Sequence, residues 1–348
     1  MQAESRQLSK QHPQRANNKQ SALTYVILNP HARGGRNAKL ATQLQKILSQ
    51  CGLDDALINT DSPQAALQMI HALPSGSRIL VAGGDGTIQH LLPALIAGGH
   101  TLGVLPLGSG NDNARTLGTY GLALDTAIQQ TLFHPASPID VGEIHFIDSS
   151  TGIPHENLFL SSLSAGFDAS ISLRARQGPA WLFGMPRYLW ATLGELRDLR
   201  HWPIHVTADE KVIHTGPALF ASCLNTPSFG GGMPAVPNAK NNDGALNLLM
   251  AGDIHMADVL QLLPRLLIGK HLGRPKVHTL AFSNLKIQSE TPIPIAADGE
   301  YLGLANEIKI SIYGLVSHGC HQNVIQRWII RCHNRQGHLG RFNFREKL

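Results

Sequence analysis

The sequence is poor in cysteine, in aromatic residues and in long apolar runs. Its four cysteines form no Cys-x-x-Cys pair, so neither a disulfide framework nor a zinc site is expected. No stretch approaches the roughly 18 consecutive apolar residues that a membrane-spanning helix needs. The N-terminus lacks the apolar segment of a secretion signal. We therefore expect a protein of the reducing cytoplasm.

The 348 residues suffice for two domains, and the 43% of hydrophobic residues is typical of soluble globular proteins. Charge is uneven, because residues 1–20 contain four basic residues and one acid, and residues 321–348 contain six and one. Since the whole chain has a net charge of +5, the body between these ends has about −3. Basic ends are typical of contact with an anionic membrane surface or a nucleic acid. The alternative is that such tails only keep the protein soluble.

The first half alternates short apolar runs with helical patterns, after a polar segment at residues 1–20 that we expect to be disordered. The apolar runs lie at residues 24–28, 56–60, 78–82 and 102–105. Three of them end in glycine-rich loops. This alternation predicts a parallel sheet covered by helices, with ligands bound beyond the carboxyl ends of the strands.

From about residue 138 short runs bounded by Gly, Pro, Asn and Asp replace this alternation. Examples lie at residues 139–146, 204–207, 212–214, 218–225, 245–250, 286–288 and 308–312. They predict an antiparallel sandwich or barrel. Two helical segments interrupt the strands, at about 169–200 with a break near 184–186, and at about 256–269.

The motif GGDGT at residues 83–87 follows an apolar strand. Glycines let main-chain N–H groups converge on an anion, and a helix starting at Thr87 would direct its positive end to the same place. Asp85 would repel a phosphate there unless a divalent metal lay between them, so the turn predicts a metal–nucleotide site. Taken alone, the same letters also fit an ordinary turn with glycines at positive φ.

Five motifs occur in an order that resembles the diacylglycerol kinase catalytic superfamily. They are GGDGT (83–87), PLGSGNDNAR (106–115), SAGFDA (164–169), GGGM (230–233) with NDG (242–244), and DGE (298–300). The resemblance spans about residues 24–315 and is closest to soluble bacterial lipid kinases, which are related to sphingosine and ceramide kinases.

This resemblance implies an N-terminal α/β domain with a parallel sheet like those of NAD kinase and phosphofructokinase, a C-terminal all-β sandwich, and a cleft between them for ATP and lipid. We therefore expect a disordered basic tail at residues 1–20, a nucleotide-binding domain at 21–137, a lipid-substrate domain at 138–316 and a basic extension at 317–348.

Matching positions with the family implies a set of ATP contacts. They are Asn29, Pro30, His31, Ala32, Arg33, Thr60, Gly84, Asp85, Gly86, Thr87, Ile88, Gln89, His90 and Ser109. Relatives usually have Thr in place of Ser109, and either hydroxyl can donate to a phosphate. Relatives mostly have Asn-Glu in place of Gln89 and His90, which leaves side-chain roles at those two positions in doubt.

Phosphoryl transfer needs a metal to bridge phosphate oxygens and a base for the acceptor hydroxyl. Asp85 and Asp112, on neighbouring loops, can hold Mg²⁺ directly or through water. Asp298 and Glu300 would face the γ-phosphate across the cleft. The resemblance makes Glu300 the first candidate for proton acceptor and gives Asp298 a place in the metal network, but the sequence does not order the two. Alone, DGE would fit an exposed hairpin turn.

A second Mg²⁺ site is implied in the C-terminal domain. Position matching assigns it the backbone carbonyls of Lys240 and Ala245 and the carboxylate of Asp243, with a capped loop that binds no metal as the alternative. The 18 histidines show no metal-ligand spacing.

Two segments have membrane-like compositions. Residues 181–202 contain three of the four tryptophans mixed with arginines, which suits a membrane interface or, equally, a helix packed on the sandwich. Residues 324–335 fit a basic amphipathic helix on anionic lipid.

Our main hypothesis is a cytoplasmic, peripherally membrane-associated kinase that uses ATP and Mg²⁺ to phosphorylate a lipid hydroxyl. Its expected partner is lipid at a membrane surface, and no nucleic acid is expected. The sequence leaves undecided whether the chain forms a homodimer. One alternative is an NAD kinase-like enzyme with a soluble acceptor, although the Asn-Glu dipeptide expected for the acceptor ribose is not suitably placed. The other is a non-catalytic lipid-binding regulatory protein, against which the four retained carboxylates argue. The acceptor lipid is not specified.

Overall fold

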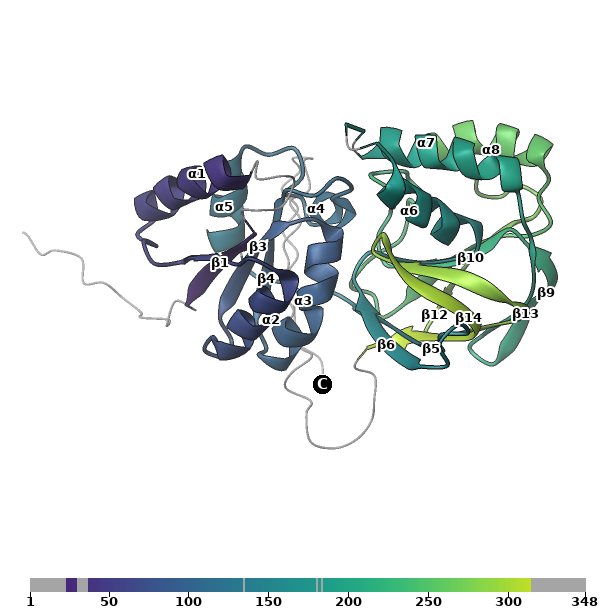
Figure 1. Cartoon of the computed structure of the whole chain (residues 1–348), viewed down its shortest axis with the longest axis horizontal. Coiled ribbons are helices and arrows are strands. Elements are labelled where there is room, and N and C mark those ends of the chain that lie inside the picture. Colours follow the sequence, from purple (N-terminus) through teal and green to yellow (C-terminus); the bar gives the residue numbers. More distant parts are fainter. Residues whose placement is uncertain (1–22, 30–36, 134, 180, 183, 314–348) are drawn as a thin grey trace, which may run out of the picture.

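The computed structural model describes residues 23–29, 37–133, 135–179, 181–182 and 184–313, which form an α/β part and a β-rich part side by side (Figure 1). The expected tail at 1–20, the extension at 317–348 and the helix at 324–335 lie outside the described residues.

The N-terminal part is built on a four-stranded parallel sheet in the order β2-β1-β3-β4. Its strands are β1 (Thr24–Leu28), β2 (Leu57–Asn59), β3 (Arg78–Gly83) and β4 (Thr101–Pro106). They are short and apolar because helices cover both faces. Helices α1 (Asn37–Gln50) and α5 (Leu124–Phe133) contribute to the buried cluster on one face, and α2 (Pro63–Ala72) and α3 (Asp85–Ala97) to that on the other.

Local signals explain the helix starts. The hydroxyl of Ser62 accepts a hydrogen bond from the N–H of Ala65 at 3.1 Å, with Pro63 in the first turn, so Ser62 is the N-cap of α2. Helix α3 begins at Asp85, two residues before the expected Thr87, with Gly84 as its N-cap. The short helix α4 (Asp112–Thr116) lies within a stretch that the sequence analysis treated as loop.

The C-terminal part is antiparallel throughout, and its strands run in the order β12-β11-β10-β7-β13-β14-β5-β6, with β8 and β9 attached to β13. The strands are β5 (Gly142–Ile147), β6 (Pro154–Phe159), β7 (Ser162–Ala165), β8 (Trp202–Ala208), β9 (Lys211–Ala218), β10 (Phe220–Leu224), β11 (Leu246–Ala251), β12 (Val277–Phe282), β13 (Asn284–Ala297) and β14 (Glu300–Ile312). The long strand β13 pairs with β8 through its first half and with β7 through its end, and its register shifts between these two regions. One apolar core fills the space that these strands enclose.

Helices α6 (Phe167–Gln177), α7 (Met185–Glu195) and α8 (Met256–Leu267) lie at one end of the C-terminal part, and a 3₁₀ turn η1 (Leu196–Asp198) follows α7 (Figure 1). The break expected near 184–186 is confirmed, because α7 starts at Met185. The two parts also share apolar packing, since Leu158 and Leu160 join the cluster that contains Leu91 and Leu92 of α3. The fold class predicted from the sequence, an α/β domain followed by an antiparallel sandwich, is confirmed.

Candidate active site between the two domains

Two glycine-rich turns of the N-terminal domain touch through their backbones. A Cβ on Gly84 would lie 2.7 Å from the Cα of Gly108, so the close approach requires glycine at both positions. Gly83, Gly84 and Gly86 do not have positive φ values, which excludes the ordinary turn with left-handed glycines. The glycines therefore bring the ends of β3 and β4 together and leave backbone N–H groups at the start of α3 uncovered by side chains.

Asp85 connects these turns through its carboxylate. Its Oδ2 accepts from the N–H of Asp112 at 3.1 Å and its Oδ1 from the N–H of Asn113 at 3.0 Å, so it caps the start of α4. Burial raises the pKa of Asp85, although these backbone hydrogen bonds act in the opposite direction. The carboxylate is thus held in one position and is costly to keep charged without a cation.

Asp112 reaches across the domain boundary. Its Oδ2 accepts from the N–H of Gly231 at 2.8 Å, and its Oδ1 accepts from the hydroxyl of Ser228 at 3.3 Å. Burial, followed by the negative charge of Asp85, raises the pKa of Asp112 to about 6. The predicted metal ligands Asp85 and Asp112 are therefore brought together, and Asp112 also anchors the GGGM loop.

The DGE motif forms the hairpin between β13 and β14. Asp298 and Gly299 have φ values of 46° and 83°, as in a two-residue type I′ turn. The carboxylate of Asp298 accepts from the N–H groups of Leu160, Ser161 and Ser162 at 2.8, 2.7 and 2.9 Å, which ties the hairpin to the strand entry beside it. Burial raises the pKa of Asp298 to about 7. Asp298 thus holds the hairpin in position, and with it Glu300 at the start of β14.

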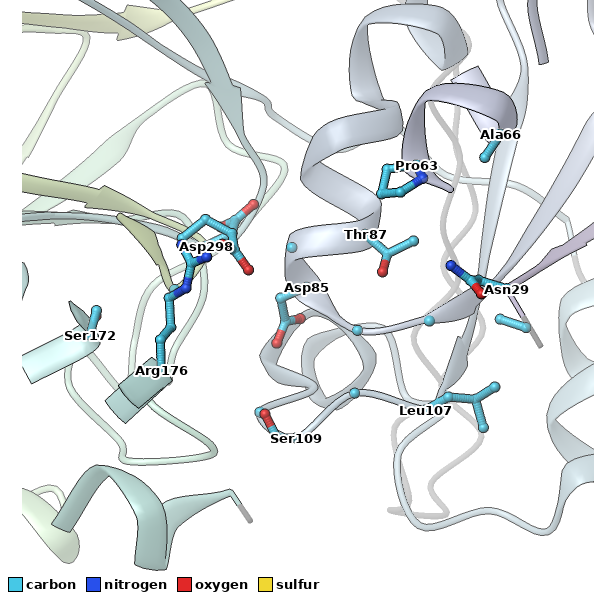
Figure 2. A pocket seen from close by; sticks show the side chains of 18 of the residues that line it. Asn29, Pro63, Ala66, Asp85, Thr87, Leu107, Ser109, Ser172, Arg176 and Asp298 are labelled. Carbon is cyan, nitrogen blue, oxygen red and sulfur yellow. Dashed lines mark ion pairs between the residues drawn. The ribbon is translucent and has the colours of Figure 1, made fainter. Parts of the chain in front are cut away.

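Glu300 extends from this hairpin to Gly86 in the GGDGT turn. A Cβ on Gly86 would come within 2.7 Å of its Oε1, and its Oε2 lies 2.7 Å from Nη1 of Arg176. Both side chains of this ion pair are about half exposed, so the carboxylate of Glu300 is open to the cleft. Figure 2 shows Arg176 and Asp298 on one side of the cleft and Asp85 and Thr87 on the other.

A cavity of about 440 Å³ occupies the cleft, with walls from both domains. Among the predicted contacts, its lining includes Asn29, Thr60, Gly84, Asp85, Gly86, Thr87 and Ser109, together with Asp298 and Glu300. Pro30, His31, Ala32 and Arg33 lie outside the described residues. The structure does not bring Ile88, Gln89 and His90 to this cavity, because α3 turns them away and Ile88 packs in the core. The size and mixed lining suit a nucleotide.

Two further cavities extend from the cleft into the C-terminal domain. The first is small and polar, lined by Asp85, Asp112, Asp298 and by Ser161, Ser162, Ser164 and Ser172. The second is almost wholly apolar, with walls from α6, α7, α8 and strands β10 and β11. Ser172 and Tyr188 line all three cavities. They therefore mark the point where the cleft cavity, the small polar chamber and the apolar pocket meet.

The sequence analysis missed four cavity residues, because it treated 169–200 only as helical and 181–202 as a packing or membrane segment. They are Ser172, Arg176, Arg187 and Tyr188. Arg187 donates to the carbonyls of Ala175 and Arg176 at 2.6 and 3.2 Å and so closes the C-terminal end of α6. Burial, followed by the charge of Asp112, raises the pKa of Tyr188, which keeps the phenol protonated. The available signal was the helix that starts within SAGFDA, just after the end of β7.

The predicted second metal site contains a carboxylate that the sequence analysis did not include. Asp140 accepts from the N–H of Gly244 at 3.0 Å, and Asp243 accepts from the N–H of Ala245 at 3.2 Å. Burial raises the pKa of Asp140, and the charge of Asp243 adds to this effect. Coordination of Mg²⁺ by Lys240, Asp243 and Ala245 stays a prediction. Asp140 lies beside these residues through its bond to Gly244.

One histidine cluster lies on the paired strands β5 and β6. Glu143, His145 and Glu156 offer ligand atoms within 4.8 Å of one another, and Nε2 of His145 is 3.3 Å from Oε2 of Glu143. None of these side chains lines the cleft cavity. Spacing along the chain did not reveal this group because strand pairing brings Glu156 opposite His145.

Comparison with known proteins decides the family. Residues 24–144 match the diacylglycerol kinase catalytic domain, and residues 161–311 match the YegS C-terminal NAD kinase beta sandwich-like domain. A diacylglycerol kinase of Mycobacterium tuberculosis is 30% identical over 278 residues, which cover 79% of this chain and 88% of that protein. The chain belongs to the diacylglycerol kinase catalytic-domain family. It is a lipid kinase.

Other relatives of this lipid kinase span both domains. A diacylglycerol kinase of Bacillus subtilis is 26% identical over 83% of this chain and 93% of its own length. The probable lipid kinase YegS of Escherichia fergusonii is 28% identical over 66% of this chain and 73% of its own. A solved structure of a putative diacylglycerol kinase from Bacillus anthracis covers 83% of this chain and 94% of that one, with a TM-score of 0.64 and 22% identity, and confirms the fold.

These findings favour the lipid kinase over both alternatives from the sequence analysis, an NAD kinase-like enzyme and a non-catalytic regulator. The relatives that match across both domains are named diacylglycerol kinases or lipid kinases. In the part of the chain that the structure describes, no helix has the length and apolar character needed to cross a membrane.

Proposed function

We propose that this lipid kinase transfers the γ-phosphate of ATP to the hydroxyl of diacylglycerol or a closely related lipid. The observation that carries the proposal is the junction at Ser172 and Tyr188, where the cleft cavity meets the apolar pocket. A lipid with its chains in that pocket presents its polar head to the cleft. The names of the relatives support diacylglycerol as the acceptor class.

The nucleotide lies along the N-terminal wall of the cleft. The turn at Gly84 and the start of α3 offer backbone N–H groups and the positive end of a helix to the phosphates. Thr60 and Ser109 line the same wall and supply hydroxyls. These groups bind phosphate without contributing a positively charged side chain, which leaves charge neutralisation to a cation and to Arg176.

Asp85 and Asp112 fit Mg²⁺. A Cβ on Gly110 would lie 3.0 Å from Oδ2 of Asp85 and 3.5 Å from Oδ2 of Asp112, so glycine keeps a small space open beside both carboxylates. Oxygen donors of this kind are what Mg²⁺ prefers. Burial raises the pKa of both carboxyl groups, and for Asp112 the negative charge of Asp85 adds to this effect. When bound, the ion would neutralise charge on the phosphate oxygens.

Glu300 is suited to accept the proton of the acceptor hydroxyl. As the lipid oxygen forms its bond to the γ-phosphorus, the hydroxyl proton passes to the Glu300 carboxylate, the bond to the bridging β-γ oxygen breaks, and ADP leaves. Arg176 holds Oε2 of Glu300 at 2.7 Å and so fixes the direction of Oε1. Asp298 positions the hairpin, because its carboxylate accepts from three backbone N–H groups, whereas the carboxylate of Glu300 is open to the cleft.

The lipid side implies a membrane surface as the partner, because the acceptor is water-insoluble. Its chains occupy the apolar pocket, where Phe167, Leu219 and Leu249 are among the wall residues. Its head occupies the serine-lined chamber. A cytoplasmic enzyme that associates peripherally with the membrane fits this arrangement.

The test is an assay of the purified full chain with ATP, Mg²⁺ and mixed micelles of diacylglycerol, with sphingoid base, ceramide and phosphatidylglycerol as other acceptors. We expect phosphatidic acid from diacylglycerol, and a loss of about 100-fold or more in kcat for Glu300→Gln. Glu290→Gln, at an exposed acid on the other strand of the same hairpin, is the matched control and keeps full activity. Absence of any phosphorylated lipid across the panel would refute the proposal.

A further inference from the structure

Helix α8 carries apolar side chains on two sides. Val259, Leu262, Leu263 and Leu266 line the apolar pocket. On the outside, Leu260 is 58% exposed, and Met256 and the adjoining Ile268 are exposed as well. A helix that only covers a pocket needs one apolar face, with polar residues toward water. The second apolar side therefore needs a separate explanation.

Helix α7 also carries exposed apolar side chains. Trp190 and Leu193 are exposed on it, and Trp181 just before it is 74% exposed. Its own Tyr188 and Thr192 line the same apolar pocket as α8. Leu196, directly after α7, shares an apolar cluster with Val259 and Leu262 of α8, so both helices border the same cluster at one end of the domain (Figure 1).

We name the six exposed apolar residues of these helices and their ends the α7–α8 surface. They are Trp181, Trp190, Leu193, Met256, Leu260 and Ile268. Apolar patches of this kind on a protein surface mark interaction sites.

The charge around this surface is positive although the body of the chain is acidic. Residues 256–276 contain Arg265, Lys270, Arg274 and Lys276 against the single acid Asp258. Lys276 pairs with Asp258 at 3.3 Å, and no ion pair among the described residues involves Lys270 or Arg274. Exposed cations bordering exposed tryptophan and leucine match a layer of anionic headgroups above hydrocarbon.

We propose that the α7–α8 surface inserts into an anionic bilayer, and that acceptor lipid enters the apolar pocket between these two helices without leaving the hydrocarbon. This rests on the proposed function for the identity of the lipid. The pocket runs from the inner sides of both helices to Ser172 and Tyr188 at the cleft, so a lipid entering there arrives with its head toward Glu300. A protein partner on the α7–α8 surface would make no use of the apolar pocket that both helices line.

Sedimentation with vesicles tests this surface without ATP. We compare phosphatidylcholine vesicles with vesicles that also contain phosphatidylglycerol. Leu193→Glu and Leu260→Glu are each expected to weaken binding about tenfold or more, because a charge is forced into the interface. The control Ile147→Glu, at a residue with similar exposure of 61% on β5, should bind like the wild type. Lys270→Glu with Arg274→Glu should remove the preference for phosphatidylglycerol.

Activity separates this inference from the proposed function. Leu193→Glu and Leu260→Glu should lose activity on vesicle-embedded diacylglycerol and keep it on a water-soluble short-chain diacylglycerol. Wild-type vesicle binding by both variants would overturn the inference, as would equal loss by Ile147→Glu. A wild-type dimer that Leu260→Glu converts to a monomer would also overturn it, because the surface would then join two copies. If the variants lose vesicle binding while no lipid is phosphorylated, the surface stands and the proposed function fails.

Discussion

The carboxylate of Asp112 accepts a hydrogen bond from the backbone N–H of Gly231 at 2.8 Å, so the nucleotide domain holds a loop of the sandwich domain. The same residue is tied through its own N–H to Asp85 at 3.1 Å. The two carboxylates that we propose as Mg²⁺ ligands therefore also connect the two walls of the cleft. A change in either carboxylate should affect both the geometry of the site and the contact between domains.

Asp112→Ala should lower the free energy of unfolding by about 1–3 kcal/mol, because it leaves the buried N–H of Gly231 without an acceptor. It should also abolish kinase activity. Urea unfolding measures the first effect. Ser228→Ala removes only the longer 3.3 Å bond and should cost less than about 1 kcal/mol. If Asp112→Ala had the same urea midpoint of unfolding as the wild type, the contact between the domains would contribute nothing to the free energy of unfolding.

Gly84→Ala should separate the two glycine-rich turns, because its Cβ would lie 2.7 Å from the Cα of Gly108. We expect the Kd for ATP, measured by calorimetry, to rise about tenfold or more and stability to fall by about 1–3 kcal/mol. Gly252→Ala is the control, since its Cβ would meet neighbours only at 3.7 Å or beyond. Equal ATP affinity for wild type and Gly84→Ala would mean that the close approach does not shape the phosphate site.

Arg176→Ala should reduce kcat about tenfold or more while changing stability by less than about 1 kcal/mol. The stability effect is small because both partners of the Arg176–Glu300 pair are about half exposed, and such pairs stabilise weakly. The catalytic effect is larger because Glu300 loses its fixed direction. Arg176→Lys should recover part of the rate. A kcat unchanged in Arg176→Ala would remove Arg176 from the mechanism.

Asp168 makes stability depend on pH. Burial raises its pKa to about 6 from an ordinary 3.8, so near pH 5 the native state binds a proton that the unfolded chain does not. Stability contributed by this group therefore falls as pH rises from about 4 to about 6, and the full cost of its buried charge is present above that range. The hydroxyl of Ser222, which donates to Asp168, opposes the shift.

Asp168→Asn should therefore be more stable than the wild type at pH 7, by an amount of order 2–3 kcal/mol, with a smaller difference at pH 5. Urea unfolding at both pH values measures this. Asp198→Asn, an exposed position on η1, should change stability by less than about 0.5 kcal/mol at either pH. The same stability difference for Asp168→Asn at pH 5 and pH 7 would contradict the raised pKa.

Much of the fold could be predicted because its signals are local. Apolar runs such as β1 and β3, the Ser62 cap and the break before α7 depend on residues within one turn or strand of each other. The helix α5 and the exact start of α3 were not predicted, since packing on the sheet decides where a helix begins and which weak helical segments persist. The site residues Arg176 and Tyr188 were missed because the nearby signal, the helix that starts within SAGFDA, does not show which of the following side chains reach the cleft.

The sequence by itself determined that an apolar strand runs into three glycines around Asp85, and it showed that Asp298 and Gly299 suit a hairpin turn, because both depend on short-range backbone preferences. Only the tertiary structure decided what each carboxylate does. Asp112 bonds to a loop 119 positions away and Asp298 to N–H groups up to 138 positions away, whereas Glu300 is left open to the cleft. Such bonds exist only after the chain has folded. Residue spacing could therefore indicate that the four acids belong to one site, but it could not show which carboxylates accept from backbone N–H groups and which one is open to the cleft.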